Sequence, residues 1–143
     1  MIADIERYTA IFNRQLRHDL KQELEPLGLN ETNFFYLPLL VQHPGINQAY
    51  FITAIMREQS IVTKQINKLV KEGWIEKRIS NEDRRQSELY PTQKTLKIMP
   101  KIDEITSSVS QKSVAGLSKE EQEQFAKLLM KATQSYAQIV LHS

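Results

Sequence analysis

The sequence contains no cysteine, few glycines and no long apolar run. Without cysteine the chain cannot form a disulfide, a thiolate zinc site, an iron–sulfur cluster or a catalytic or oxidant-sensing thiol. A membrane-spanning helix needs about 18 consecutive apolar residues, and no window of the chain provides them. The first residues also carry acids where a signal peptide carries bases. We therefore expect a cytoplasmic protein with no membrane partner.

The sequence also lacks the motifs of enzymes and of bound metals. No nucleophile elbow, glycine-rich phosphate loop or paired-carboxylate motif is present. The three histidines, His18, His43 and His142, stand at no metal-ligand spacing. We therefore expect no enzymatic activity, no metal site and no cofactor.

The charges are unevenly distributed along a chain of ordinary globular composition. The 143 residues are 41% hydrophobic and carry a net charge of +2, which is typical of one soluble domain. Residues 57–101 contain 11 Lys and Arg against 6 Asp and Glu, whereas the rest of the chain contains 8 against 11. A basic middle between acidic flanks suggests that this region faces a polyanion.

Helical spacing of apolar residues dominates the chain and predicts six helices. The first spans residues 2–25, and the last two follow Thr92 and the capping box of Ser118 with Glu121. Three shorter helices are expected between them. One covers residues 30–43 with Asn30 as its N-cap, and Pro38 should kink or shorten it. The next covers residues 47–55 with Asn47 as its N-cap, and the third ends at Glu72, before Gly73.

A short β-hairpin is expected between the fourth and fifth helices. Residues 74–79 and 87–90 have strand character, and residues 80–86 form a polar turn between them. Two short helices followed by a hairpin have the order of a winged helix-turn-helix. The predicted fold is mainly α, with six helices and a β-hairpin wing.

The fourth helix and the hairpin tip carry the candidate DNA-binding residues. On a helical wheel, Val62, Ile66, Leu69 and Val70 form an apolar stripe, and the opposite face contains no acid. Such a face is also common on solvated helices, but here a hairpin with arginines at its tip follows at once. Its residues can contact phosphates and base edges, and a tip arginine oriented by an aspartate can enter a minor groove. The candidates are Ser60, Thr63, Lys64, Asn67, Lys68 and Lys71 on the helix, and Asp83, Arg84 and Arg85 on the hairpin.

At these residues the sequence resembles the MarR family of bacterial transcription regulators. The family pattern combines a Ser-Thr-Val-Thr-Arg recognition helix, a Leu-x-x-x-Gly-x-Ile-x-Arg segment, an Asp-x-Arg wing and a Leu-Thr-x-x-Gly exit. The matching segments are residues 60–64, 69–78, 83–85 and 91–95. The chain departs from the pattern at Met56, Arg57, Lys64, Pro91 and Thr95.

The resemblance implies a single domain over residues 1–143, with a winged DNA-binding lobe at residues 29–95. Residues 1–27 and 96–143 are then dimerisation helices, and their apolar stripes independently require a partner surface. The recognition helix (59–72) is expected in the major groove and the wing (80–87) in the minor groove. The implied protein is a homodimeric regulator, typically a repressor, of a pseudo-palindromic operator in double-stranded DNA, and it responds to a small aromatic or anionic effector.

Two alternatives remain open from the sequence. The aromatic residues Phe34, Phe35, Tyr36, Tyr50 and Phe51 could line an effector pocket, although Phe34 and Phe51 are better explained as core residues. The chain could also be a winged-helix interaction module without DNA binding. That class would show acids on the outer face of the fourth helix or a wing without arginine, and the sequence shows neither.

Overall fold

The computed structural model describes residues 1–141, so His142 lies outside the described part of the chain. This part contains six α-helices and one two-stranded antiparallel sheet, which confirms the predicted mainly α fold with a hairpin. None of its helices is long and apolar enough to cross a membrane. In chain order the elements are α1 (Ile5–Leu24), α2 (Tyr36–Gln42), α3 (Gln48–Ile55), α4 (Gln59–Lys71), β1 (Ile75–Ile79), β2 (Ser87–Pro91), α5 (Gln93–Ser113) and α6 (Lys119–Leu141), with short 3₁₀ turns at Ile2–Asp4 and Glu25–Leu27.

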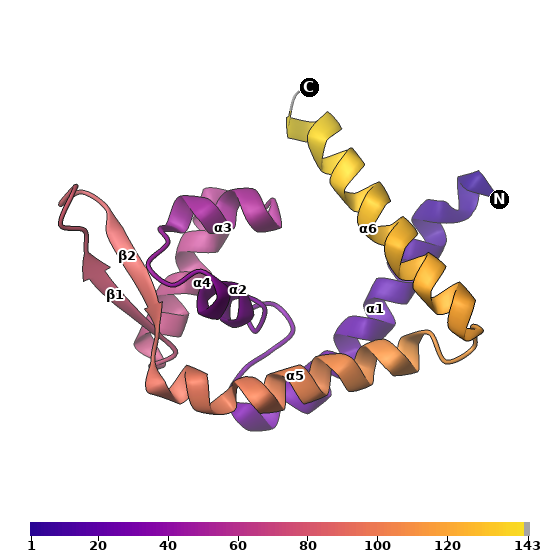
Figure 1. Ribbon diagram of the computed structural model, residues 1–143, viewed down its shortest axis with the longest axis horizontal. Coiled ribbons are helices and arrows are strands. Elements are labelled where there is room, and N and C mark those ends of the chain that lie inside the picture. The colour runs from indigo at the N-terminus through magenta and orange to yellow at the C-terminus, as the bar shows by residue number, and fades with distance from the viewer. Residues whose placement is uncertain (142–143) are drawn as a thin grey trace.

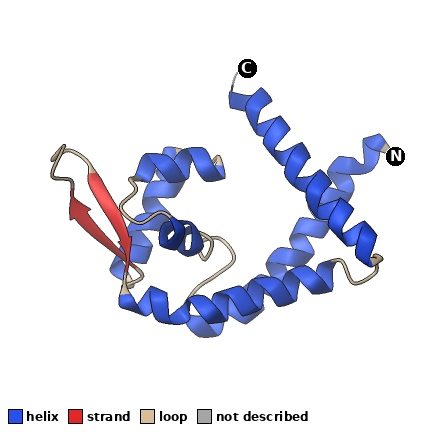
Figure 2. Cartoon of the chain, in the orientation of Figure 1, coloured by secondary structure: helices blue, strands red, loops and turns tan. Residues whose placement is uncertain are grey.

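Figure 1 shows a compact lobe joined through α5 to a pair of crossing helices. Helices α2, α3 and α4 and the hairpin form the lobe. Helix α5 runs from the hairpin to the opposite end of the molecule, where α1 and α6 cross. Figure 2 shows the two strands together at the outer edge of the lobe. The hairpin is therefore far from α6.

The core lies in the lobe and continues along the two long helices beside it. Phe51 of α3 and Ile66 of α4 are each 0% exposed, and the Phe51 ring lies 5.2 Å from the Tyr36 ring. Leu24 of α1 and Ile102 of α5 belong to the same buried cluster. The lobe is therefore packed directly on α1 and α5.

Helix α2 begins at Tyr36, so the predicted start at Asn30 is wrong. The Asn30 side-chain oxygen accepts a hydrogen bond from the Thr32 amide (2.9 Å), and the Asn33 side chain accepts one from the Asn30 amide (3.1 Å). These local bonds satisfy the backbone in successive turns instead of a helix. Pro38 then falls in the first turn of α2, where a missing N–H removes no helical hydrogen bond. The helix is shorter than predicted, and Pro38 lies at its N-terminal end and not in its interior, where it was expected.

Gly73 ends α4 as predicted. Its φ of +84° places it in the left-handed region that favours glycine. The Gly73 amide donates to the Val70 carbonyl (3.1 Å), and the Trp74 amide donates to the Leu69 carbonyl (2.9 Å). This pair of bonds is the Schellman motif, which satisfies carbonyls at the end of a helix and turns the chain into β1.

The predicted N-caps of α3 and α6 are also present. The Asn47 side chain accepts a hydrogen bond from the Tyr50 amide (3.3 Å). The Ser118 amide donates to a Glu121 carboxylate oxygen (2.8 Å), and the Glu121 amide donates to Ser118 Oγ (3.2 Å). Hydrogen bonds from Ser118 lower the pKa of Glu121 below its usual value, as expected for a carboxylate in a capping box.

The first turn of α5 holds the end of α4. Lys94 Nζ donates to the Glu72 carbonyl (2.8 Å) and lies 4.0 Å from the Trp74 ring centre. Thr95 is fully buried, and its hydroxyl donates to the Trp74 carbonyl (2.6 Å). Thr92 caps α5 by accepting from the Thr95 amide. Thr95, a departure from the family pattern, therefore ties α5 to the segment that follows α4.

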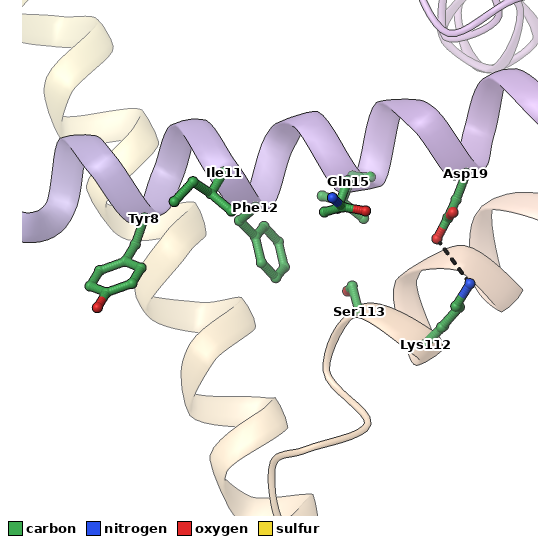
Figure 3. A pocket seen from close by; sticks show the side chains of 8 residues that line it. Tyr8, Ile11, Phe12, Gln15, Asp19, Lys112 and Ser113 are labelled. Carbon is green, nitrogen blue, oxygen red and sulfur yellow. Dashed lines mark ion pairs between the residues drawn. The ribbon is translucent and has the colours of Figure 1, made fainter.

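Helices α1 and α6 expose a large apolar surface. None of residues 119–140 is buried, although Phe12 and Phe125 pack edge to face with ring centres 5.6 Å apart. A cavity of about 430 Å³ lies between α1 and the end of α5, with the Asp19–Lys112 ion pair (3.3 Å) at one end (Figure 3). The exposed apolar side chains include Ile2, Ile5, Tyr8, Ile11, Leu128, Leu129, Met130, Tyr136 and Ile139.

Candidate nucleic-acid interface

The outer face of α4 projects into solvent. Val62, Ile66 and Leu69 are each 0% exposed and fix the orientation of the helix in the lobe. The opposite face carries no acid, in agreement with the helical wheel. Five candidate side chains on it are exposed, namely Ser60, Lys64, Asn67, Lys68 and Lys71, whereas Thr63 is half-buried.

Thr63 is half-buried because α3 covers it. The Gln48 side-chain amide of α3 donates a hydrogen bond to the Thr63 hydroxyl. Gln48 is the first residue of α3, so the contact links the two helices of the helix-turn-helix. Sequence reasoning did not find Gln48, because a contact over 15 positions leaves no local pattern.

Asn67 has a partner in β1. Lys77 Nζ lies 3.4 Å from Asn67 Oδ1, and because an ammonium only donates, the atom facing it is the carbonyl oxygen of the amide. The Asn67 NH₂ group is then left available as a donor. Lys77 was not among the sequence candidates. The signal that could have identified it is strand alternation, which places Lys77 on the same face of β1 as the buried Ile75.

The wing tip holds Arg85 through Asp83. One Asp83 carboxylate oxygen accepts from the Arg85 amide (3.0 Å) and from Arg85 Nε (3.4 Å). The Arg85 side chain is nevertheless 93% exposed, and Arg84 beside it is exposed as well. Ser80 Oγ accepts from the amides of Glu82 and Asp83 (3.3 Å each) and shapes the turn before the tip. The predicted contact between Asp83 and the Arg85 guanidinium is present.

The hairpin is anchored to the segment that precedes α3. The Gly45 amide donates to the Leu89 carbonyl, and the Leu89 amide donates to the Ile46 carbonyl (2.8 Å each). The Asn47 side-chain amide donates to the Gln86 side chain (3.4 Å). The wing and the helix-turn-helix are therefore connected through backbone as well as side-chain bonds.

Arg78 is engaged within the hairpin rather than free for a ligand. Its Nε and Nη2 lie 3.1 Å from the two Glu76 carboxylate oxygens, and its guanidinium stacks 4.1 Å from the Tyr90 ring centre. The hydrogen bond from Arg78 lowers the pKa of Glu76. Arg78 therefore stabilises the base of the wing, in contrast to Arg85 at its tip.

A cavity of about 280 Å³ lies between α1 and the lobe. Arg17 of α1 and Arg57, which precedes α4, contribute two guanidinium groups, and Phe35 and Tyr36 contribute aromatic rings. Burial raises the pKa of Tyr36, and the charge of Arg57 opposes this shift. Phe51 lies in the core and Phe34 packs against it, as the sequence favoured for these two rings.

Comparisons with known proteins agree with this geometry. The sequence pattern of the MarR family matches residues 29–87. The HTH-type transcriptional regulator BilQ of Clostridium symbiosum is 27% identical over 124 residues, covering 87% of this chain and 86% of BilQ. The uncharacterized HTH-type transcriptional regulator YybA of Bacillus subtilis is 26% identical over 126 residues, covering 88% and 84%.

A solved structure extends the similarity to the whole fold. A Listeria monocytogenes protein, described as a MarR family transcriptional regulator and solved in complex with a 26-mer DNA, superposes with a TM-score of 0.88 at 23% identity. The superposition covers 97% of this chain and 93% of that one, so it includes the lobe and the long helices outside it. The family model covers the winged lobe, and the relatives and the solved structure extend the likeness to most of the chain: in sequence pattern and fold this chain is similar to the MarR family of transcriptional regulators.

Proposed function

We propose that the protein is a homodimer that binds double-stranded DNA with sequence preference. In this proposal residues 59–72 enter the major groove and the wing, residues 80–87, enters the adjacent minor groove. The observation that carries it is the acid-free outer face of α4 beside a wing whose Asp83 holds an exposed Arg85. Both surfaces belong to one lobe, so a single docking event can engage them together.

The side chains of the interface divide into two chemical roles. Ser60 and Asn67 are exposed and have the hydrogen-bonding groups to read base edges, whereas Thr63 acts together with Gln48. Lys64, Lys68 and Lys71 are phosphate contacts, because a lysine ammonium is a flexible point charge. Arg85 is the minor-groove contact, Asp83 positions it, and Arg84 supports it through a neighbouring phosphate.

The surface area of one protomer supports the dimer. A monomeric protein of 16.7 kDa exposes about 7,600 Å² by the usual scaling of area with mass, whereas this chain exposes 10450 Å². The excess of about 2,800 Å² per protomer, or about 5,600 Å² for the pair, lies at the upper end of what obligate homodimers bury. Much of it lies on the apolar faces of α1 and α6, so we assign residues 1–27 and the described part of 96–143 to the dimer interface.

The cavity between α1 and the lobe supports modulation by a small ligand. Its two guanidinium groups attract an anion, and its aromatic rings favour a flat apolar body. A small aromatic carboxylate or phenolate combines both properties. Because the cavity joins a proposed dimerisation helix to the DNA-binding lobe, an occupant would bias how the two are oriented.

The decisive experiment is selection of bound duplexes from a random DNA pool, repeated with phenolic acids present. We expect a pseudo-palindrome with half-sites about 34–36 Å apart to be enriched. We also expect the phenolic acids to lower the retained fraction. Retention on heparin separates the alternative class, because a winged helix that acts only through protein partners would not need elevated salt for elution.

Replacing Lys64 tests the outer face of α4. Lys64→Ala should weaken operator binding by about 1–2 kcal/mol for each half-site. It should also lower the slope of log affinity against log salt concentration by the equivalent of about one phosphate contact for each half-site. Ser60→Ala and Asn67→Ala should instead change which bases are selected. Binding isotherms at several salt concentrations measure the first effect, and repeated selection measures the second. An unchanged salt slope for Lys64→Ala would mean that this face is merely solvated.

Replacing Arg85 tests the wing. A narrow A·T-rich minor groove has an enhanced negative potential, so Arg85→Ala should lose affinity mainly on operators with A·T-rich flanks. Asp83→Asn should lose less, because it loosens the arginine without removing it. Arg84→Ala is the matched control, with a similar small loss on either flank. The measurement compares operators that differ only in flank composition at one salt concentration.

The outcomes of the wing experiment separate three roles. Equal losses for Arg85→Ala on both flanks would make this arginine a general phosphate contact. No loss on either flank would show that the wing does not touch DNA.

A further inference from the structure

A second polar site lies beside the recognition helix. A cleft of about 310 Å³ separates the start of α4 from the wing. Its walls include Gln48 of α3, Gln59 of α4, Lys77 of β1 and Arg85 of the wing, and none of its lining residues is acidic. The cleft therefore presents two cations and several amide groups to whatever enters it.

The adjoining cavity has the opposite charge character. It measures about 300 Å³, shares Asn47 and Gln86 with the cleft, and is lined by Glu82 and Glu88. An anion at this side of the lobe would therefore be attracted to the cleft and repelled from its neighbour. The contrast gives the lobe one defined place for a negatively charged ligand between α4 and the wing.

The charge of Lys77 is not neutralised within the described chain. Glu76, its neighbour in β1, is held by Arg78 through two hydrogen bonds of 3.1 Å. None of the ion pairs within residues 1–141 includes Lys77. Its contact with Asn67 Oδ1 uses one of the three ammonium hydrogens, and two remain for a ligand.

We propose that this cleft seats the sugar–phosphate strand that separates the major groove from the adjacent minor groove, and that Lys77 contacts its phosphates. The inference rests on the proposed DNA binding. One strand divides the two grooves, so with α4 in one and the wing in the other, that strand must cross the space between them. The cleft occupies that space, and its cations match the charge of the strand.

The test combines a lysine variant with a neutral phosphate. On the selected operator, Lys77→Ala should weaken binding about fivefold and lower the salt slope by about one for each half-site, without changing the selected bases. A duplex with methylphosphonate at the phosphates between the two grooves should bind wild-type protein about fivefold more weakly. The same duplex should give Lys77→Ala no further loss, because the partner charge is already missing.

Lys127→Ala is the matched control, because it removes the same charge from the side of α6 opposite the apolar Leu129, and Figure 1 places α6 away from the wing. It should retain the wild-type salt slope and the full methylphosphonate effect. If Lys77→Ala also retains both, the inference is wrong while the proposed DNA binding stands. The inference is likewise wrong if Lys77→Ala alters only the selected bases, since the residue would then act through Asn67. Absence of preference among duplexes in the wild-type protein would instead contradict the proposed function itself.

Discussion

Leu129→Glu should convert the proposed dimer to monomers and lower operator affinity by about 100-fold, because two linked half-sites bind far more tightly than one. Leu129 is 49% exposed in the protomer and lines an apolar cavity with Phe12 and Phe125. A carboxylate there remains hydrated in the monomer, but it would be buried without a partner charge in the dimer. Sedimentation at micromolar concentration measures the oligomeric state, and binding to the selected operator measures the affinity.

The control for this variant is Gln124→Glu. It adds the same charge to the same helix, but the helical step places it on the side opposite Leu129. We expect it to remain dimeric and to bind DNA normally. A dimeric Leu129→Glu protein with full affinity would show that α6 does not contribute this face to the interface.

The largest loss of stability is expected for Phe51→Ala. The Phe51 ring is 0% exposed, lies 5.2 Å from the Tyr36 ring and 5.7 Å from the Tyr50 ring, and joins α3 to the rest of the lobe. Its removal should lower the free energy of unfolding by about 3–5 kcal/mol through lost burial and the cavity left behind. Urea unfolding at one fixed protein concentration measures the change, since the stability of a dimer depends on concentration.

Phe51→Leu is the reference for that measurement. It retains most of the buried volume, so it should cost less than about 1.5 kcal/mol. Equal losses for the two variants would mean that the lobe closes around the missing ring, and that the core is less rigidly packed at α3 than its burial indicates.

Three helix ends were predictable because the hydrogen bonds that fix them join residues close in the chain. Gly73, Asn47 and Ser118 each act within five positions, and each is found in its predicted role. Asn30 carries the same signal as Asn47, but there the prediction was wrong. Asn33 lies three residues later and bonds back to the Asn30 amide, which favours turns over a helix.

The candidate interface was predictable in its local features and not in its tertiary contacts. Burial of Val62 and Ile66 turns the acid-free face of α4 outward, as periodicity indicated, and Asp83 reaches Arg85 over two positions. Gln48 and Lys77 were missed because they reach α4 from other elements of the fold. The functional roles of the interface residues remain predictions.

Thr95 and Lys94 couple the orientation of α5 to the orientation of the lobe. Their bonds to Trp74 and Glu72 clamp one end of a 21-residue helix to the end of α4, and the other end of that helix lies beside α1 and α6. Such a helix is about 31 Å long, so tilting it by about 5° displaces its far end by about 3 Å. That displacement is comparable to the rise of one base pair. In the proposed dimer, repacking at that end would therefore tilt α5 together with the lobe attached to it and change the spacing between the two proposed DNA-binding lobes.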